Sequence, residues 1–594
     1  MARNTYDQDE QLESPFDITH LKRAYVYIKK YKNKMLLSLL LSAFAAVTGL
    51  LGPIITQYAL DVTIPNKDIP QLLLLSAALA VTLLISIMFS VIRSRIMTVV
   101  GQDIIFDIRT DIFAHLQKLP FQYYDDRPHG KIQIRVVNYV NSVSDMLSNG
   151  IINVILEFLN ILFIAVFMFF VNVKLSLVVL AGVPLFVGVM FAIKTHQRRA
   201  WQQVSNKSSN LNAYLQENIV GARVTQVFVR EDENTGIFDR LSQKYRKVWM
   251  KAVAFSNLVW PSIDNISTLV RAAIYFVGLI LIGPSTISLG VIAAMSSYAA
   301  RFWQPFLNLS NLFNNFINNI AYLERIFETL DEPVTVADAE GATELGEIEG
   351  NLSFENVTFA YEEGKNILEN VSFDVKAGES IALVGPTGAG KTTIVNLISR
   401  FYNLNGGKVT IDGQDISEVT LKSLRSQMGI MLQDSFIFSG TIYDNIRYGK
   451  LDATEEEIVK ACKTVCADGF IRNFKDGYNT EVNERGSLLS QGQKQLISFA
   501  RTLLSDPRIL ILDEATSSID AQTEMLLQQG LLELLKGRTS FIIAHRLSTI
   551  KNCDKIMYIS NKGITECGSH DELIALKGDY YKLYTAQHEE IETA

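Results

Sequence analysis

Long apolar runs fill the first half of the chain and decide what it can fold into. The first, 35–60, and the second, 69–92, contain no charged residue, and each is long enough to cross the hydrocarbon core of a bilayer as a helix. A backbone surrounded by lipid must satisfy its own hydrogen bonds, so runs of this length form helices there. Further runs follow at 151–173, 175–193, 252–282 and 289–321. The sequence therefore predicts an all-α transmembrane domain of six helices over 34–330.

The positions of Lys and Arg predict which side of the membrane each connection faces. Basic residues gather before the first run and after the second and fourth runs. In the connections 61–68, 172–174 and 283–288, the basic residues are Lys67 and Lys174 alone. Positive side chains favour the cytoplasmic side. We therefore expect a multi-pass protein of the cytoplasmic membrane, with its N-terminus and everything after the sixth run in the cytoplasm.

Other stretches of this half are expected to lie outside the hydrocarbon core. Residues 14–33 combine apolar and basic side chains at helical spacing, which predicts a cytoplasmic tail and an interfacial helix over 1–33. The connections 93–150 and 194–251 have helical periodicity, so we expect them to be long intracellular extensions of the membrane helices. Near the tip of the first extension, 121–130 predicts a turn that can touch a cytosolic domain.

Charged and polar side chains inside the runs are candidates for a substrate path. Glu157, Asp264, Arg271 and Arg301 are costly in lipid and usually face a cavity or a partner helix. The sixth run continues with amides at three- and four-residue spacing: Asn308, Asn311, Asn315 and Asn318. This stripe either lines a cavity for amphipathic molecules or hydrogen-bonds between helices.

The pattern changes after an acidic linker over 331–350, which contains Pro333 and glycines. From residue 351 onward, short β-branched strands alternate with helices, which predicts an α/β domain over 351–594. With a net charge of −7 and no long basic block, no nucleic-acid partner is expected.

The stretch from Gly385 to Thr392 fits G-x-x-x-x-G-K-[ST], the phosphate-binding P-loop. An apolar strand precedes it and a helical segment follows, which is the context that the motif requires. Glycines let successive N–H groups point at phosphate oxygens, and a helix N-terminus favours an anion. Lys391 is expected to reach the β- and γ-phosphates of ATP and Thr392 to hold Mg²⁺. The predicted nucleotide-binding residues here are Gly385, Pro386, Thr387, Gly388, Ala389, Gly390, Lys391, Thr392 and Thr393.

Two carboxylates follow a second apolar strand, 508–512. Asp513, at its end, is expected to hold the Mg²⁺ shell, and Glu514 to polarise the water that attacks the γ-phosphate.

A helix start at 489–493 carries a second anion-binding pattern. Ser490 stands where an N-cap residue is expected, and a glycine follows shortly after. Because the P-loop already serves the chain's own ATP, this second site would have to serve a different ATP molecule.

Taken in order, these motifs resemble those of the ATP-binding cassette (ABC) transporters, specifically exporter-type half-transporters with six membrane helices followed by one nucleotide-binding domain. The resemblance covers almost the whole chain. It implies that Leu489-Ser490-Gln491-Gly492-Gln493 is the signature motif, which binds ATP through Ser490, Gln491, Gly492 and Gln493. It also implies adenine stacking for Tyr361, a Q-loop role at Mg²⁺ and the attacking water for Gln433, a D-loop at 518–520, and a switch role on the γ-phosphate for His545.

The same resemblance implies a dimer in which each ATP lies between one P-loop and the opposite signature. Gln491 stands where the family pattern has glycine, and its side chain adds bulk beside phosphate. Because Glu514 and His545 are both present, this chain's own P-loop site has the catalytic residues that the resemblance implies. That asymmetry resembles bacterial heterodimeric multidrug exporters and favours a different half-transporter as partner. In the alternative, Gln491 is tolerated in a homodimer.

We therefore expect ATP-driven export of amphipathic small molecules, drugs and possibly lipids, by alternating access, with ATP and Mg²⁺ as cofactors. A lipid flippase or a peptide exporter of the same architecture is the alternative. Glu514 and His545 speak against a third class, a membrane-anchored regulatory ATPase or channel that does not pump.

Overall fold

The computed structural model describes residues 19–127, 129–283, 286–362, 364–431, 435–483, 486–513, 521–543 and 547–593. The chain forms two compact units. The helical unit comprises Met1–Gln117 and His129–Glu332, and the α/β unit comprises Lys118–Pro128 and Pro333–Ala594.

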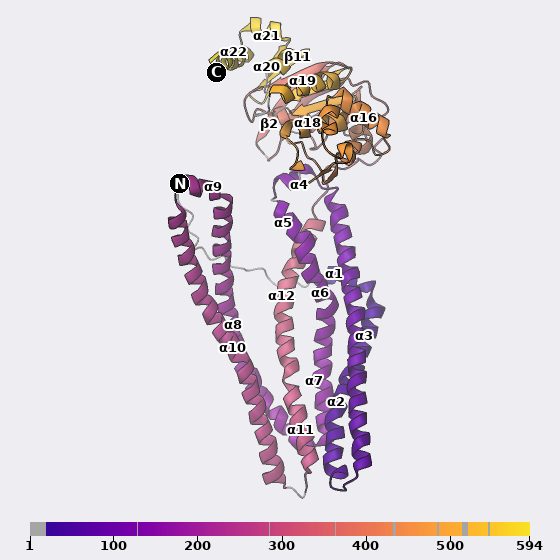
Figure 1. Cartoon of the computed structure of the whole chain (residues 1–594), viewed down its shortest axis with the longest axis vertical. Helices are drawn as coiled ribbons and strands as arrows, with labels where there is room; N and C mark the ends of the chain where they lie inside the picture. The colour runs from indigo at the N-terminus through magenta and orange to yellow at the C-terminus, as the bar shows by residue number, and fades with distance from the viewer. Residues whose placement is uncertain are drawn as a thin grey trace. The chain divides into compact units, whose positions relative to one another are not determined.

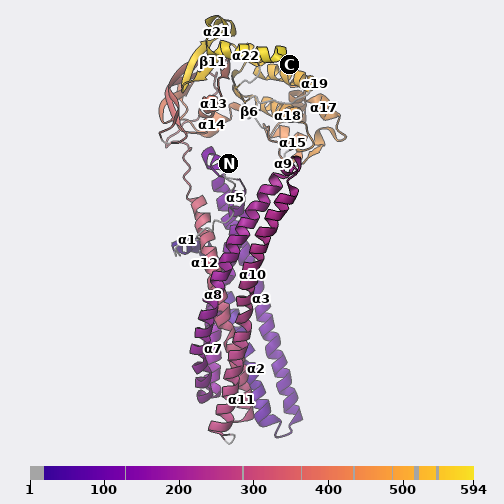
Figure 2. The ribbon, with the colours of Figure 1, turned by 90° about the vertical axis from the view of Figure 1, so that its left-hand side faces the viewer.

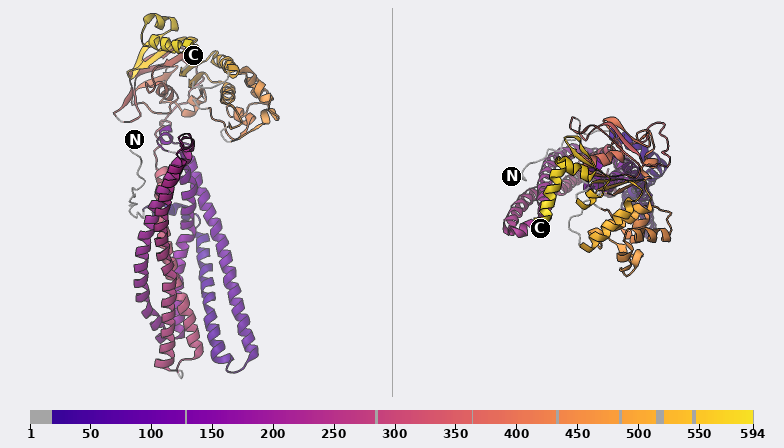
Figure 3. Two further views of the ribbon diagram at one scale, coloured as in Figure 1. Left: turned by 60° about the vertical axis from the view of Figure 1, so that its left-hand side comes forward. Right: turned by 90° about the horizontal axis from the view of Figure 1, so that it is seen from above.

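Long helices make up the helical unit and run alongside one another (Figure 1, Figure 3). The helices are α1 (Thr19–Lys29), α2 (Lys32–Tyr58), α3 (Ile69–Leu116), α5 (His129–Ile134), α6 (Val140–Asp145), α7 (Ile151–Val171), α8 (Val173–Val220), α9 (Ala222–Val227), α10 (Glu231–Phe276), α11 (Leu289–Phe302) and α12 (Gln304–Leu330). Single π-helical turns lie at Ala59–Thr63, Arg135–Tyr139, Met146–Gly150 and Val277–Ile282.

Among the residues that the structure describes, five helical segments are long and apolar enough to cross a membrane: Lys32–Thr63, Ile69–Leu116, His129–Val171, Val173–Val220 and Glu231–Ile282. The expected sixth span is two consecutive helices, α11 and α12, that meet at Trp303. Pro305 occupies the first turn of α12, where its missing N–H costs nothing. Trp303 is 1% exposed and its ring stacks on Phe186 of α8 with centroids 5.1 Å apart. The break in the sixth span is therefore packed into the core of the unit.

The long connections 93–150 and 194–251 are mostly helical, as the periodicity predicts. Helix α3 has 48 residues, α8 has 48 and α10 has 46, which corresponds to roughly 70 Å each at 1.5 Å per residue. Helices α8 and α10 lie side by side, and the short α9 joins their ends (Figure 2). These helices are about twice as long as a bilayer core requires, since roughly 20 residues span it.

Carboxylates one helical turn apart on α3 hold the N-terminal helices. The contacts are Lys34 Nζ to Asp103 at 3.2 Å, Lys30 Nζ to Asp107 at 3.0 Å, and the Tyr27 hydroxyl donating to Asp111 at 2.9 Å. Each such exposed pair stabilises by only about 0–1 kcal/mol. Their regular spacing nevertheless fixes how α1 lies along α3.

A carboxylate also caps the start of α11. Ser288 Oγ donates to Asp61 at 2.5 Å, and the Gly290 N–H donates to the same carboxylate at 2.7 Å. A Cβ on Gly290 would lie 2.5 Å from the Asp61 carboxylate, so only glycine leaves room for this contact. The cap joins the α2–α3 turn to the sixth span.

The α/β unit is built on two main sheets. Its strands are β1 (Leu352–Ala360), β2 (Asn366–Val375), β3 (Ser380–Val384), β4 (Gly406–Ile411), β5 (Gln414–Asp415), β6 (Met428–Met431), β7 (Gly440–Thr441), β8 (Glu481–Val482), β9 (Ile509–Asp513), β10 (Thr539–Ile543), β11 (Lys555–Ser560) and β12 (Gly563–Gly568). One sheet is antiparallel with the order β2-β1-β4-β5, and the other has the order β12-β11-β3-β10-β9-β6. In the second sheet every pair is parallel except β11–β12, and β7 pairs with β8 separately.

Helices surround these sheets. They are α4 (Phe121–Asp125), α13 (Lys391–Ile398), α14 (Leu421–Arg425), α15 (Ile442–Arg447), α16 (Glu455–Thr464), α17 (Asp468–Arg472), α18 (Gln491–Leu504), α19 (Ala521–Leu535), α20 (Leu547–Lys551), α21 (His570–Leu576) and α22 (Asp579–Thr593), with a 3₁₀ turn at Gly477–Asn479. Helices α15, α17 and α18 gather on one side of β6, and α13 and α14 on the other (Figure 2). Two apolar cores result, one on each face of the parallel sheet.

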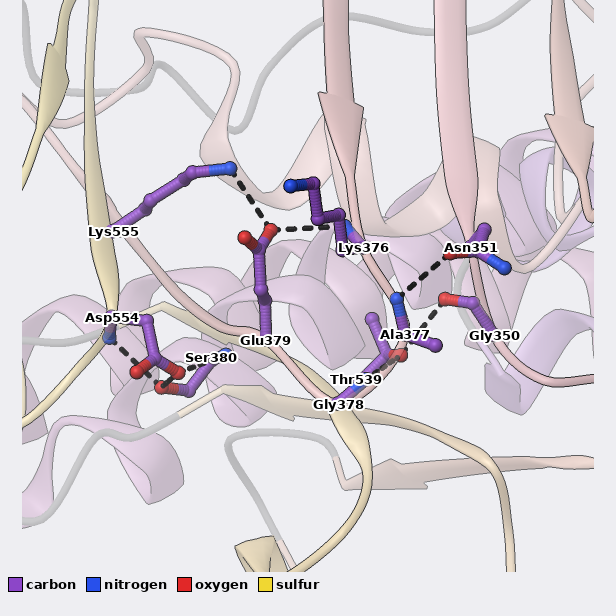
Figure 4. A network of polar contacts seen from close by, with 10 residues as sticks. All are labelled: Gly350, Asn351, Lys376, Ala377, Gly378, Glu379, Ser380, Thr539, Asp554 and Lys555. Carbon is purple, nitrogen blue, oxygen red and sulfur yellow. Dashed lines mark hydrogen bonds and ion pairs between the residues drawn. The ribbon is translucent and has the colours of Figure 1, made fainter.

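A polar network ties the start of β3 to its neighbours (Figure 4). Ser380 donates from both its N–H and its hydroxyl to Asp554, and Lys555 pairs with Glu379 at 2.9 Å. The buried Thr539 hydroxyl donates to the Gly350 carbonyl at 2.8 Å and accepts from the Gly378 N–H at 3.0 Å. The strand that leads into the P-loop is thereby fixed at its beginning.

Candidate functional site

The P-loop turns sharply between β3 and α13 because its glycines adopt backbone conformations closed to other residues. Gly385 has φ +146°, and a Cβ there would lie 2.2 Å from the Ile559 carbonyl oxygen. Gly390 has φ +107° at the N-cap position of α13, where a Cβ would meet Leu368 at 3.0 Å. The predicted strand, loop and helix are all present, and the loop geometry depends on these glycines.

Lys391, the first residue of α13, folds back over the loop. Its side chain is buried, and Nζ donates to the carbonyls of Gly385 at 2.8 Å and Pro386 at 3.0 Å. Burial lowers the pKa of Lys391, and the charge of Asp513 opposes that shift. The ammonium group is therefore held at the loop by weak carbonyl contacts that phosphate oxygens can replace.

A cavity of about 540 Å³ opens over the loop. Its lining residues are Tyr361, Ile367, Thr387, Gly388, Gly390, Lys391, Thr392, Thr393, Asp513 and Ile543. The volume falls within the roughly 300–1,000 Å³ of small-molecule sites. The lining offers a glycine cradle, a cation, hydroxyls and a carboxylate, which is the donor set that ATP with Mg²⁺ requires. The residues present therefore fit both groups.

The register of the parallel sheet explains how distant segments reach this cavity. Ile543 at the end of β10 pairs with Leu383 of β3 on one side and with Asp513 of β9 on the other. The carboxyl ends of three strands thus meet at one edge, and Asp513 comes beside the loop. Three predicted residues, Gln433, Glu514 and His545, follow β6, β9 and β10 in the sequence and lie outside the described residues.

Tyr361, predicted to stack on adenine, lies at the cavity wall. Its hydroxyl is 3.2 Å from Thr393 Oγ1, and its ring packs edge-on against Tyr402 with centroids 5.1 Å apart. The ring is 37% exposed, so a planar group can still pack against it. The sequence motif did not indicate Ile367, which enters the cavity because β2 runs antiparallel to β1 past the loop.

The predicted signature residues form the start of α18. Ser490 is its N-cap, and its hydroxyl accepts from the Gln493 N–H while the Gln493 side chain accepts from the Ser490 N–H. Gln491 is exposed, and Gly492 is buried. Among the described residues, the lining of the P-loop cavity includes none of these four. They form a separate helix start with its side-chain cap in place.

The tip of the first predicted extension belongs to the α/β unit and packs on Phe401 and Tyr402. The Tyr402 hydroxyl donates to Asp125 of α4 at 2.7 Å, and Phe121 packs on Phe401 with ring centroids 4.4 Å apart. Burial and the Asp125 carboxylate raise the pKa of the Tyr402 hydroxyl. The expected contact of this tip with the C-terminal domain is present. Tyr402 itself gave no sequence signal, because its role depends on two chain segments far apart.

In the helical unit, several predicted intramembrane residues have partners on other helices. Asn308 donates to Glu157 at 2.7 Å, and Lys194 donates to Asn311 at 3.1 Å. Arg301 donates to the Gly49 carbonyl at 2.8 Å. Interhelical hydrogen bonding therefore accounts for part of the amide stripe.

The other polar residues of the amide stripe and of the fifth predicted span are either exposed or hydrogen-bonded within their own helix. Asn315 and Asn318 are exposed, as is Asp264. Arg271 bonds Thr268 on its own helix at 2.9 Å.

Long apolar helices joined to a P-loop domain define a membrane transport ATPase. Two family models match the chain: that of the ABC transporter transmembrane region over residues 35–306 and that of the ABC transporter over residues 368–517. The chain belongs to the ABC transporter family. It is an exporter-type protein that carries the membrane region and the ATP-binding, transport-coupled ATPase domain in one polypeptide.

Relatives cover nearly all of the chain. The putative multidrug export ATP-binding/permease protein YgaD of Bacillus subtilis (strain 168) is 35% identical over 580 residues, which are 96% of this chain and 99% of the relative. The fatty acid ABC transporter ATP-binding/permease protein of Mycobacterium bovis (strain ATCC BAA-935 / AF2122/97) is 36% identical over 512 residues, 86% of this chain and 81% of the relative. A solved structure of a bacterial Atm1-family ABC exporter with ATP bound superimposes with a TM-score of 0.76 at 28% identity, covering 96% of this chain and 99% of that one. This half-transporter architecture implies a dimer in a membrane.

Replacing Lys391 tests the P-loop site directly. Lys391→Ala removes the buried cation that faces the cavity, so we expect the affinity for ATP to fall by about tenfold or more. Fluorescence titration of the purified protein with a labelled ATP analogue measures it. The matched control is Lys422→Ala, an exposed lysine on α14, which should leave the affinity unchanged. Equal affinities in both variants would contradict the assignment.

Replacing Tyr402 tests the contact with α4. Tyr402→Phe keeps the ring against Tyr361 but removes the bond to Asp125, which is worth about 1 kcal/mol for an exposed hydrogen bond, or roughly fivefold in an equilibrium. We expect ATP hydrolysis to continue while substrate moved per ATP falls severalfold in proteoliposomes. Tyr448→Phe, on an exposed tyrosine, is the control. An unchanged transport-to-hydrolysis ratio would show that this hydroxyl plays no part in coupling.

Proposed function

We propose that this chain is one half of a dimeric exporter that moves amphipathic small molecules, drugs and possibly lipids, across the cytoplasmic membrane by alternating access. The observation that carries the proposal is the packing of α4 on Tyr402, next to the Tyr361 wall of the P-loop cavity. A nucleotide that packs against Tyr361 can then bias the position of the segment that leads into the membrane helices. The multidrug and fatty acid relatives support an amphipathic substrate.

Each residue of the cavity has a proposed part in ATP hydrolysis. Tyr361 packs against adenine, and Lys391 neutralises the β- and γ-phosphates. Thr392 and Asp513 would hold Mg²⁺, together with Gln433; the ion supplies charge neutralisation of the phosphates. Glu514 orients and polarises the attacking water, and His545 holds the γ-phosphate. The shared edge of β9 and β10 supports these last roles, because both residues follow strands that end there.

The signature residues are proposed to serve the ATP of the partner subunit. Ser490, Gln491, Gly492 and Gln493 start a capped helix whose free N–H groups suit a phosphate. Gln491 is exposed at its first position, where glycine would leave more room. We infer a heterodimer in which this chain's P-loop forms the hydrolytic site and its signature faces a weaker site. A homodimer that tolerates Gln491 is the alternative.

The distribution of basic residues supports an orientation with the N-terminus and the α/β unit in the cytoplasm. In that orientation ATP is available at the P-loop, and transport runs outward.

Glu514→Gln tests the reaction. The substitution keeps the side-chain size but removes the group that activates water, so hydrolysis should fall by about 10²–10⁴ while ATP still binds. Phosphate release and nucleotide affinity of the purified protein measure the two effects. Glu456→Gln, an exposed acid on α16, is the matched control. Near-normal turnover in Glu514→Gln would rule out its role as base.

Expression of the chain alone tests the subunit composition. If it works as a heterodimer, the purified chain should have low ATPase activity in lipid because its partner subunit is absent. In the complex with that partner, Gln491→Gly should raise hydrolysis little, because the partner's site remains limiting. Mass measurement in nanodiscs together with phosphate release decides the question. A stable, fully active homodimer would refute the heterodimer and show that Gln491 is tolerated.

Substrate type separates the exporter from a flippase. ATP is added to the solution outside proteoliposomes. The uptake of an amphipathic dye is then compared with the translocation of a fluorescent phospholipid. Dye uptake that depends on Glu514 supports the export of small molecules. Lipid translocation without dye uptake would favour the flippase.

A further inference from the structure

A groove in the helical unit lies between α8 and α10. It encloses about 430 Å³, and its walls combine Trp201 of α8 with Tyr245 and Trp249 of α10, one turn apart. Val204 lies in its lining and is 4% exposed, and Ser205 and Ser208 add hydroxyl groups. Trp201 lies eight residues beyond the fourth apolar run, so roughly 12 Å past its end at 1.5 Å per residue. The groove therefore lies just outside the membrane-spanning part of these helices.

The aromatic wall is fixed by contacts within the protein. The Trp201 indole N–H donates to Ser256 Oγ at 3.1 Å, and Gln197 donates to the same oxygen at 2.9 Å. The rings of Trp201 and Trp249 meet edge to face, with centroids 5.2 Å apart. A tryptophan that anchors a helix at the membrane surface usually directs its N–H to the polar headgroup region. In this structure the Trp201 N–H is already bonded to Ser256. Trp201 is 37% exposed and Trp249 is 39% exposed, so both rings can still contact a ligand.

Basic residues lie close in the sequence to the tryptophans of the groove. Stretches 194–216 and 240–263 contain lysines and arginines but no acid, and the first acids beyond them are Glu217, Asp239 and Asp264. Arg198 and Arg246 precede Trp201 and Trp249 by three residues, so each shares a helix face with its tryptophan. Both arginines are exposed, and within the described part of the chain neither has a carboxylate partner. A ligand that fits here has an apolar body and a negative head.

We propose that this groove is a binding site for free single-chain anionic amphiphiles, with the apolar chain against Trp201, Trp249 and Val204 and the anionic head on Arg198 and Arg246. This site would load substrate for export, and that role rests on the proposed function. Arginine suits the head because its planar fork binds a carboxylate through two hydrogen bonds. The helices that carry the groove continue into the membrane spans, so a molecule bound there lies next to the path that an exported amphiphile would take.

Fluorescence quenching tests the site in the full-length protein reconstituted into phosphatidylcholine nanodiscs without ATP. The probes are 12-bromododecanoate and 12-bromododecyltrimethylammonium, which share a chain and differ in head charge. The background is Trp260→Phe, because Trp260 is 65% exposed in the fifth predicted span and would report partitioning into lipid. We expect saturable quenching by the carboxylate and about tenfold or more weaker binding in Arg198→Gln and Arg246→Gln. Arg240→Gln, an exposed arginine farther along α10, is the matched control and should bind normally.

The outcomes separate the site from its alternatives. Equal quenching by both probes, or equal affinity in the Arg198, Arg246 and Arg240 variants, would overturn the proposal. Nanodiscs that contain phosphatidylglycerol test the source of the ligand. Unchanged affinity for the carboxylate probe supports a free amphiphile. Loss of quenching means that a bilayer lipid occupies the groove, and this result would overturn the proposal. Because binding is measured without ATP, a protein that binds the carboxylate but transports nothing would leave the groove standing and refute the proposed function alone.

Discussion

Parallel pairing of β3, β10 and β9 is the constraint on which the nucleotide site depends. The pairing brings the carboxyl ends of three strands to one edge, although β3 precedes β9 and β10 by more than a hundred residues of sequence. Asp513 reaches the loop only because Ile543 pairs with it on one side and with Leu383 on the other. The polar network around Ser380 and Thr539 fixes the beginning of the central strand, so its end delivers the P-loop in a defined place.

The cavity is joined to the rest of the molecule through aromatic side chains. Tyr361 contacts Tyr402, and Tyr402 donates to Asp125 of α4. Segment 118–128 interrupts the helical unit in the sequence yet packs with the α/β unit. The wall of the cavity at Tyr361 is therefore linked through side-chain contacts to α4, the segment that follows α3 in the chain.

Charges in the helical unit follow two different rules. Inside the apolar part, Glu157 is met by an amide of α12, and Lys194, directly after the fourth run, is met by another, which limits the cost of placing a charge near lipid. Outside it, Arg198 and Arg246 have no carboxylate partner among the described residues. An unpaired charge costs little in water, so both guanidinium groups can bind a ligand. This difference in pairing distinguishes residues that hold the helices together from residues that can receive a ligand.

The sequence alone determined the long helices, the P-loop and the capped start of α18, because each depends on local rules: the length of an apolar run, glycine conformations at Gly385 and Gly390, and the side-chain reach of Ser490. It also indicated that the tip of the first extension can contact another domain, and 118–128 packs in the α/β unit. Only the tertiary structure decided that the sixth span breaks at Trp303, that Ile367 lines the cavity, that Tyr402 meets Asp125 and that Trp201 and Trp249 enclose a groove. Those features depend on packing between segments distant in sequence, and no local pattern encodes which side chains will meet.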